Sequence, residues 1–217
     1  MKTFDYYEFA GVLCPGVVVL YSMSMIFPWI SPIVHDQSIS VGSLGLFVVL
    51  SYVAGHLVQA LGNLLEPLLW RFFGGTPTDW VRTRRHTLLT DQQNAVVEER
   101  IKTQTGMPLS STTQNEWRST VRSIYAAVAN SGHASRIDVF NGNYGLFRGL
   151  ATAFLLSAFS ILARPTFRWS AFVFLLACAL LAIYRLRRFG IHYARELFVQ
   201  FLQLKELVAQ SPKETAK

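Results

Sequence analysis

The 217-residue chain has few charged residues and almost no cysteine. Asp, Glu, Lys and Arg make up 15% of it, against about a quarter in a typical soluble domain. The two cysteines, Cys14 and Cys178, both lie in apolar runs, which excludes a small secreted module held by several disulfides. The 16 Phe, 8 Tyr and 5 Trp exclude a disordered chain, because disordered segments are poor in aromatic residues.

Signatures of known enzyme classes are also missing. The sequence has no Walker motif, no GxGxxG, GxSxG or HExxH pattern, and no cluster of Cys and His. Its 5 histidines are scattered over different segments. We therefore expect no enzymatic activity, no cofactor and no metal site. A membrane enzyme whose catalytic group assembles only in the fold is the remaining alternative.

The sequence instead contains long uncharged runs. Residues 9–34 and 37–65 contain no Asp, Glu, Lys or Arg, and a helix needs about 20 apolar residues to cross a bilayer. Pro28 and Pro32 end the first helix early, and Pro165 turns the last two runs into a hairpin. The pattern predicts an all-α integral membrane protein with four transmembrane helices, over residues 9–27, 37–65, 144–163 and 169–184.

Basic residues are unevenly divided among the connecting segments. Residues 35–40 contain no Lys or Arg and residues 164–168 contain two, whereas residues 71–148 contain ten and residues 185–217 contain seven. Basic segments stay inside, so both termini and the middle region are expected to be cytosolic at a bacterial inner membrane. The expected domains are a first transmembrane hairpin (1–73), a cytosolic helical domain (74–143), a second transmembrane hairpin (144–184), and a cytosolic amphipathic helix with a frayed tail (185–217).

Capping signals place the helices of the middle domain. Thr76-Pro77-Thr78-Asp79 is a capping-box pattern that opens a short basic helix, expected to include Arg82, Arg84 and Arg85. The other expected helix starts and stops are N-caps at Thr90, Thr113 and Ser135, and glycine stops at Gly106 and Gly132. The helix that begins at Ser135 is expected to run without a break into the third span.

A stripe of polar residues follows the second span. Steps of three and four residues place its members on one helical face: Tyr52, His56, Gln59, Asn63 and Glu66. Polar groups at membrane depth are costly, so these face protein or water. One interpretation is a pore lining or gate. The other is interhelical hydrogen bonding, in which Gln59 and Asn63 bond to neighbouring spans and Glu66 pairs with Arg148 or Arg71. Arg148 of the third span either reaches the lipid head groups or forms a salt bridge with Glu66.

Arginines and aromatic residues are interleaved in the middle domain. Residues 74–143 carry eight bases and six acids, a net charge too low for a duplex DNA binder. A local patch would still suit the phosphates and stacked bases of a single strand or a nucleotide. The candidate ligand-binding residues are Arg82, Arg84, Arg85, Trp117, Arg118 and Arg122. The alternative is a solvated helix face with one buried aromatic side.

The C-terminal segment combines a basic cluster with an apolar stripe. Arg185, Arg187 and Arg188 directly follow the fourth span, where such clusters fix topology and attract anionic lipid. The apolar stripe that follows includes Ala194 and Phe198. It is expected to pack on the middle domain or to assemble with copies of itself, because the polar face has too few bases for a membrane-surface helix.

Four stretches together suggest a family: Pro15–Leu20, Gly55–Asn63, Phe140–Gly149 and Arg187–Glu196. They resemble small bacterial membrane proteins of anti-phage defence loci, in particular the transmembrane effector of Hailong-type systems. The resemblance covers most of the chain and rests on the overall pattern. It implies a homo-oligomer, with a tetramer as the working hypothesis, that permeabilises or depolarises the inner membrane. It also implies a partner nucleotidyltransferase whose single-stranded DNA product keeps the effector closed.

Two hypotheses on function therefore stand. The first is an oligomeric channel-type effector, gated through the cytosolic helical domain, in which the stripe from Tyr52 to Glu66 surrounds the axis. The alternative is a non-conducting membrane scaffold or sensor that recruits a cytosolic partner. Mutants of the polar stripe should fail to conduct in the first case and fail to assemble in the second.

Overall fold

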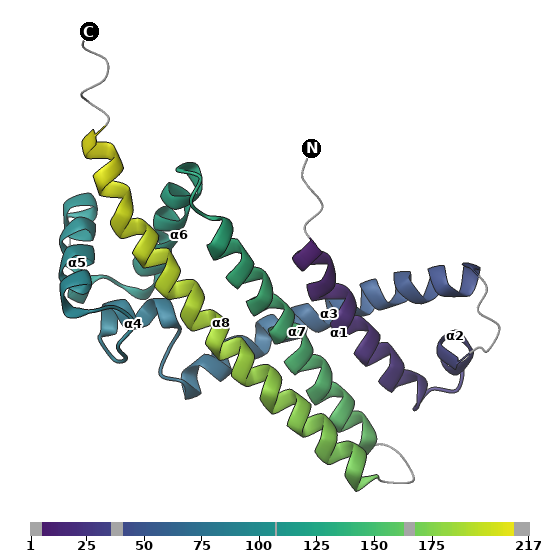
Figure 1. The fold of residues 1–217 in the computed structure, drawn as a ribbon. Helices are drawn as coiled ribbons and strands as arrows, with labels where there is room; N and C mark the ends of the chain where they lie inside the picture. Colours follow the sequence, from purple (N-terminus) through teal and green to yellow (C-terminus); the bar gives the residue numbers. More distant parts are fainter. Residues whose placement is uncertain (1–5, 36–40, 107, 163–167, 211–217) are drawn as a thin grey trace. The chain divides into compact units, whose positions relative to one another are not determined.

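The computed structural model describes residues 6–35, 41–106, 108–162 and 168–210, and all regular structure within these ranges is helical (Figure 1). The first half contains α1 (Tyr6–Ser24), α2 (Ser31–His35), α3 (Val41–Phe72) and α4 (Pro77–Thr83). The second half contains α5 (Asp91–Thr105), the 3-10 turn η1 (Leu109–Ser111), α6 (Gln114–Asn130), α7 (Ser135–Leu162) and α8 (Trp169–Gln210). The expected all-α class is confirmed.

Three helical stretches within the described residues are long and apolar enough to cross a membrane: Val41–Thr83, Ser135–Leu162 and Trp169–Leu204. The apolar helix Phe9–Ser24 is shorter than these. It ends at Ser24 and not at the predicted Phe27, because the chain turns before Pro28 and resumes as α2. The predicted bend at Arg164-Pro165-Thr166 lies outside the described residues. Three of the four predicted spans thus have helices of sufficient length.

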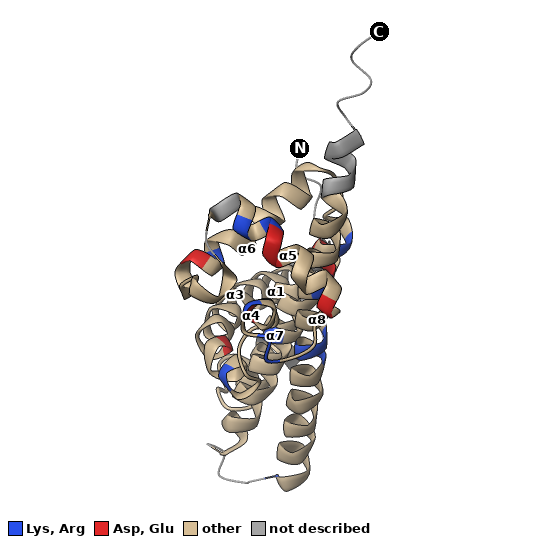
Figure 2. Cartoon of the chain, turned by 90° about the vertical axis from the view of Figure 1, so that its left-hand side faces the viewer, with Lys and Arg blue, Asp and Glu red and all other residues tan. Residues whose placement is uncertain are grey.

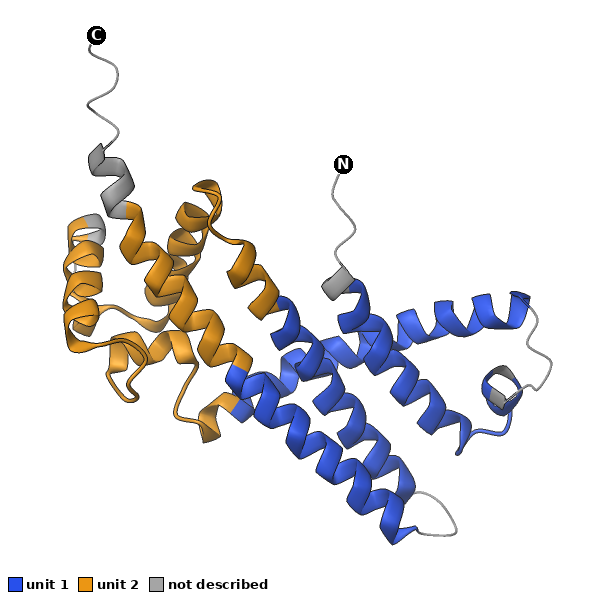
Figure 3. Cartoon of the chain, viewed as in Figure 1, with its two compact units in different colours: residues 1–69, 142–188 blue, residues 70–141, 189–217 orange. Residues whose placement is uncertain are grey.

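The described chain divides into two compact units (Figure 3). Unit 1 comprises residues 1–69 and 142–188, and unit 2 comprises residues 70–141 and 189–217. Within unit 1, long helical segments are uncharged: residues 149–162 of α7 and 169–184 of α8 contain no Lys, Arg, Asp or Glu (Figure 2). Unit 1 therefore contains the apolar helical segments, and unit 2 contains most of the charged ones.

Glycines bring the backbones of α1 and α3 together in unit 1. A Cβ atom on Gly16 of α1 would overlap the carbonyl oxygen of Ser51, and one on Gly55 of α3 would overlap the carbonyl oxygen of Val12. Helix α7 also contacts α1, since the Ser22 hydroxyl of α1 donates to the Ser157 hydroxyl of α7 at 2.6 Å. Small residues allow such close packing where helices lack a hydrophobic driving force for association.

Unit 2 has an aromatic and aliphatic core. Trp117 of α6 is 1% exposed and stacks on Phe198 of α8, with ring centroids 6.1 Å apart. The apolar stripe of α8 packs here, because Ala194, Leu197 and Phe198 are all buried in this core. Of the two alternatives for the C-terminal stripe, the described residues show the packing on the middle domain.

Several predicted helix ends are confirmed by their caps. The capping boxes at Thr90 and Thr113 are both formed, with Gln93 and Glu116 as the reciprocal partners. Gly106 ends α5 in the left-handed conformation, with φ of 73°. Helix α7 continues unbroken to Leu162, as expected, but Ser135 is its first helical residue and not its N-cap, since the Asp138 N–H donates to the Ala134 carbonyl.

Two expectations about helix boundaries are wrong. The helix α4 ends at Thr83, so Arg84 and Arg85 lie outside it: Arg84 adopts the left-handed conformation, and its N–H donates to the Trp80 carbonyl. Thr76 forms no side-chain cap, because its hydroxyl donates to the Asp79 carboxylate at 2.8 Å instead. Helix α8 is continuous from Trp169 to Gln210, through the expected domain boundary at residues 184/185.

Candidate functional site

The polar stripe of α3 is divided between a packed side and an exposed side. Gln59 and Glu66 are partly buried within unit 1, next to the buried Gly55, Val58 and Gly62. The other members, Tyr52, His56 and Asn63, are exposed. The stripe therefore lies along the edge of the surface that α3 presents to α1 and α7.

Gln59 connects three helices of unit 1. Its side-chain amide donates to the carbonyl oxygens of Gly11 in α1, at 2.7 Å, and of Gly145 in α7, at 3.0 Å. Its carbonyl oxygen accepts from the Arg148 guanidinium at 3.2 Å. Both amide hydrogens and the oxygen are thus used, which satisfies a polar group that would be costly to leave unpaired in an apolar environment.

Arg148 and Glu66 form an ion pair between α7 and α3. The guanidinium lies 2.7 Å from the carboxylate, and the two side chains are 22% and 27% exposed, respectively. The guanidinium also lies over the Tyr144 ring, 5.8 Å from its centroid. The structure therefore contains the salt bridge that was one of the two alternatives for Arg148. Gln59, Arg148 and Glu66 form one continuous polar network, called the α3–α7 network below.

A small crevice of about 70 Å³ adjoins the α3–α7 network in unit 1. Its walls come from α3, α7 and α8 and are mainly aliphatic: Gly62, Leu65, Glu66, Leu69, Arg148, Ala151, Thr152, Leu155, Ile183 and Leu186. The ion pair thus lies at the edge of an apolar space.

The exposed members of the stripe are aromatic or polar. The His56 ring meets the Tyr52 ring edge-on, with centroids 4.6 Å apart, and Tyr52 stacks on Phe9 of α1 at 6.2 Å. Asn63 lies two turns of α3 beyond His56 and is exposed as well. These side chains present hydrogen-bonding groups on the outside of unit 1, on a helix that is apolar enough to cross a membrane.

The candidate ligand-binding arginines of unit 2 have different environments. The Arg82 guanidinium donates to the Thr112 carbonyl at 2.8 Å and to Gln114 at 2.6 Å, and Arg84 pairs with Glu98 at 3.0 Å. Arg85, Arg118 and Arg122 are exposed. Trp117 is not on this surface, because it is a core residue, so it cannot stack on a ligand next to Arg118. Of the predicted patch, Arg118 and Arg122 remain side by side on α6, one turn apart.

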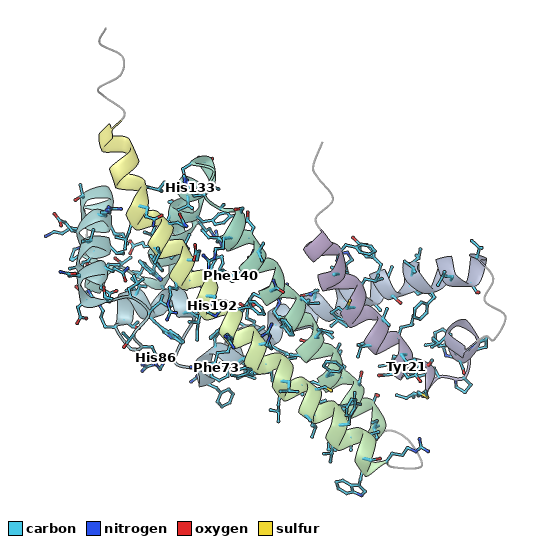
Figure 4. All side chains as sticks on the ribbon, viewed as in Figure 1. Tyr21, Phe73, His86, His133, Phe140 and His192 are labelled. Atoms are coloured by element: carbon cyan, nitrogen blue, oxygen red, sulfur yellow. The ribbon has the colours of Figure 1, made fainter. Side chains whose placement is uncertain are left out.

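The histidines and tyrosines of unit 2 have ring and carboxylate neighbours. His192 stacks on Phe140 with centroids 5.4 Å apart, while His86 and His133 lie elsewhere in the unit (Figure 4). The Tyr125 hydroxyl donates to the Asp138 carboxylate at 2.7 Å. This hydrogen bond raises the pKa of Tyr125 to about 12, and the burial of the hydroxyl is the second cause of the increase. Among the described residues, no group of three or more His, Cys, Asp or Glu side chains is placed to hold a metal ion.

Sequence reasoning missed the glycines as functional positions. Gly11 and Gly145 provide the carbonyl groups that hold Gln59, and Gly16 permits the close contact with α3. The available signal was the small-residue character of Gly55 and Gly62 beside the polar stripe. It did not identify the matching glycines on α1 and α7.

Comparisons of the chain with protein-family models, curated proteins and solved structures gave no match.

Proposed function

We propose that the protein is a homo-oligomeric, channel-type membrane effector in which the exposed polar face of α3 lines a water-filled path. The observation that carries this proposal is the exposure of His56, Asn63 and Tyr52 on a helix that is apolar enough to cross a membrane. The neighbouring exposed residues of α3 are aliphatic, such as Leu57 and Leu64, and suit contact with lipid. Only one edge of the helix therefore requires a polar environment.

The energetic cost of polar side chains in lipid supports the proposal. Lipid tails offer no hydrogen-bond partner, and polar side chains at membrane depth almost always face protein or a water-filled cavity. Gln59 and Glu66 meet this requirement within a single chain. His56 and Asn63 meet it if copies of the chain surround a common axis, so that this edge of α3 faces water or another copy.

The α3–α7 network supplies a means of gating. Helix α7 is uninterrupted from Ser135 to Leu162, so a movement of its first turns is carried along the helix to Arg148. Arg148 contacts both Gln59 and Glu66 of α3. A displacement of α7 would therefore shift the helix that carries the polar face.

The proposal includes four spans, with the middle region and both termini in the cytosol of a bacterial inner membrane. Arg118 and Arg122, exposed on α6, are the proposed contacts for the phosphates of a single-stranded DNA that holds the effector closed. A nucleotidyltransferase would supply this DNA, and the biological role would be anti-phage defence, as the family resemblance implies.

A second candidate function has an observation of its own. Gln59 makes three interhelical hydrogen bonds and Glu66 is paired, so two of the five stripe residues have a purely structural explanation. If the three exposed residues only join copies of the chain, the protein is a non-conducting scaffold that recruits a partner. This alternative predicts tight membranes and loss of assembly when the stripe is altered.

Ion leakage from proteoliposomes tests the proposal. Wild-type protein should release a trapped ion indicator, and His56→Leu and Asn63→Leu should change the release at least severalfold while the oligomer, measured by size-exclusion chromatography with light scattering, is retained. Leu57→Val, a change at an exposed aliphatic position of the same helix, is the matched control and should leave leakage unchanged. Sealed vesicles with intact wild-type oligomers would contradict a channel.

The ligand is tested in the same vesicles. A short single-stranded DNA on the Arg118 side should reduce leakage, and the double variant Arg118→Gln/Arg122→Gln should leak equally with and without it. Arg136→Gln, a change of an exposed arginine on α7, is the control. DNA that leaves wild-type leakage unchanged would rule out this ligand without affecting the channel proposal.

A further inference from the structure

Two glycines shape the loop that follows α3. Gly74 and Gly75 have φ of 79° and 99°, in the left-handed region that favours glycine, and the Gly75 N–H donates to the Trp70 carbonyl at 2.8 Å. A Cβ atom on Gly74 would lie 3.1 Å from Nε2 of His86 and 3.3 Å from Cδ of Arg85. The loop after α4 therefore packs directly on the loop after α3, within unit 2.

Aromatic side chains hold His86 against this loop. Its ring centroid lies 4.4 Å from that of Trp80, and the Trp80 ring meets the Trp70 ring edge-on at 6.5 Å. Both tryptophans are buried, whereas His86 is exposed. Figure 4 labels His86 and also Phe73, a residue of the loop whose ring packs on Trp70 at 5.8 Å. The imidazole is thus held by a buried aromatic pair while part of its surface stays accessible.

The arginines next to this loop differ in their partners. Arg84 pairs with Glu98 at 3.0 Å. Arg85, and Arg71 in the last turn of α3, are exposed, and their side chains form no ion pair or hydrogen bond within the part of the chain that the structure describes. The Arg71 carbonyl accepts from the Gly74 N–H at 3.3 Å, so Arg71 adjoins the same loop. Two permanent positive charges therefore lie beside Gly74.

A nearby carboxylate does not neutralise these charges. Asp79 lies 3.8 Å from a Cβ atom built on Gly75. Its oxygens accept from the Thr76 hydroxyl at 2.8 Å and from the Gln114 amide at 3.0 and 3.1 Å. Asp79 thus belongs to a hydrogen-bond network between α4 and α6 and pairs with neither arginine.

The end of α3 suits the level of lipid head groups. The helix has 32 residues and is about 48 Å long, close to the roughly 40–45 Å of a bilayer that includes its head groups. Phe72, its last residue, is 81% exposed. An exposed apolar ring beside basic side chains is typical of the boundary between acyl chains and head groups, where the ring enters the apolar layer and the charges stay at the surface.

We propose that Arg71, Arg85 and His86, called the Gly74 cluster below, bind the phosphate group of an anionic phospholipid such as phosphatidylglycerol. Guanidinium groups match phosphate oxygens with paired donors. Uncompensated positive charge selects an anionic lipid over a zwitterionic one, because the ammonium group of the latter would be repelled. The proposal goes beyond conduction, since a non-conducting scaffold with the same α3 would bind the same lipid.

Lipid binding by delipidated full-length protein tests the proposal. Native mass spectrometry counts the phosphatidylglycerol and phosphatidylcholine molecules bound per chain. Each basic residue near an anionic head group contributes about fivefold in affinity, so Arg85→Gln should require about fivefold more phosphatidylglycerol for the same occupancy. Arg71→Gln/Arg85→Gln should retain one phosphatidylglycerol fewer per chain than wild type, with phosphatidylcholine unchanged. Arg84→Gln, a change of the neighbouring arginine that pairs with Glu98, is the matched control and should bind as wild type does.

Melting temperature and soluble phosphates complete the test. Both variants should melt as wild type does, because the two arginine side chains have no described partner; if the double variant fails to fold, the shift of Arg85→Gln alone decides. Neither soluble glycerophosphoglycerol nor a short single-stranded DNA should displace the bound lipid, since the Phe72 ring adds contact with the acyl chains. Equal binding of both lipids by wild type, undiminished phosphatidylglycerol binding in the variants, or displacement by either soluble phosphate would overturn the proposal.

Discussion

The contact between α1 and α3 makes a direct prediction for Gly55→Ala. The added methyl group would overlap the Val12 carbonyl oxygen and lie 2.7 Å from its carbon, whereas ordinary contact begins at 3.4 Å. The helices must therefore separate by at least 0.7 Å, the difference of these two distances. Overpacking costs about 1–3 kcal/mol, and we expect the upper half of this range because the obstacle is the backbone of another helix. The Gln59 hydrogen bond to Gly11, which spans the same contact, would lengthen as well.

The matched control is Gly45→Ala on the same helix, where an added Cβ meets nothing within 4 Å. Both variants remove a glycine from the interior of α3, so helix propensity favours them equally. Unfolding in mixed detergent, followed by circular dichroism, should show a large loss of stability for Gly55→Ala and none for Gly45→Ala. Equal stability of the two variants would refute the close contact of α1 and α3.

Three other predictions follow from particular contacts. Glu66→Gln should destabilise the protein by about 1–3 kcal/mol. This cost is smaller than the cost of breaking a fully buried ion pair, because both side chains are about a quarter exposed. A double-mutant cycle with Arg148→Gln should show coupling, and additive effects would contradict the ion pair. Thr90→Ala should remove the capping box of α5 and cost about 1 kcal/mol, seen as faster amide exchange in its first turn; unchanged exchange there would contradict the cap. The pKa of Tyr125 is raised from 10.0 to about 12 by its hydrogen bond to Asp138. The contribution of this hydrogen bond to the stability of the folded protein is therefore complete below pH 10 and is lost as the pH rises toward 12. Unfolding measured against pH should show this loss in wild type and a smaller one in Tyr125→Phe; identical profiles would contradict it.

Local patterns predicted local structure well. The capping boxes at Thr90 and Thr113 depend on residues only three positions apart, and both are present. The end of α4 could not be predicted in the same way. Arg84 turns the chain in the left-handed conformation, which arginine rarely adopts, and no glycine or proline marked the position.

Long-range partners were the part that sequence could not supply. The spacing of the stripe on α3 placed Gln59 on a polar face, but its acceptors are backbone carbonyls 48 and 86 residues away. Every residue has a backbone carbonyl, so nothing in the amino-acid sequence identifies Gly11 or Gly145 as an acceptor. Trp117 is a similar case: its position beside Arg118 is compatible with both a stacking surface and a core, and only the packing against Phe198 decides for the core.

The central proposal, a water-filled path along the exposed polar edge of α3, is tested most directly by cysteine accessibility. In a background of Cys14→Ser and Cys178→Ser, His56→Cys and Leu64→Cys are reconstituted into vesicles and exposed to a charged, membrane-impermeant thiol reagent. Leu64 is the control because its side chain is 76% exposed and lies on the aliphatic side of the same helix. A water-filled path predicts rapid labelling at position 56 and little at position 64. Equal protection of both positions would contradict a water-filled path.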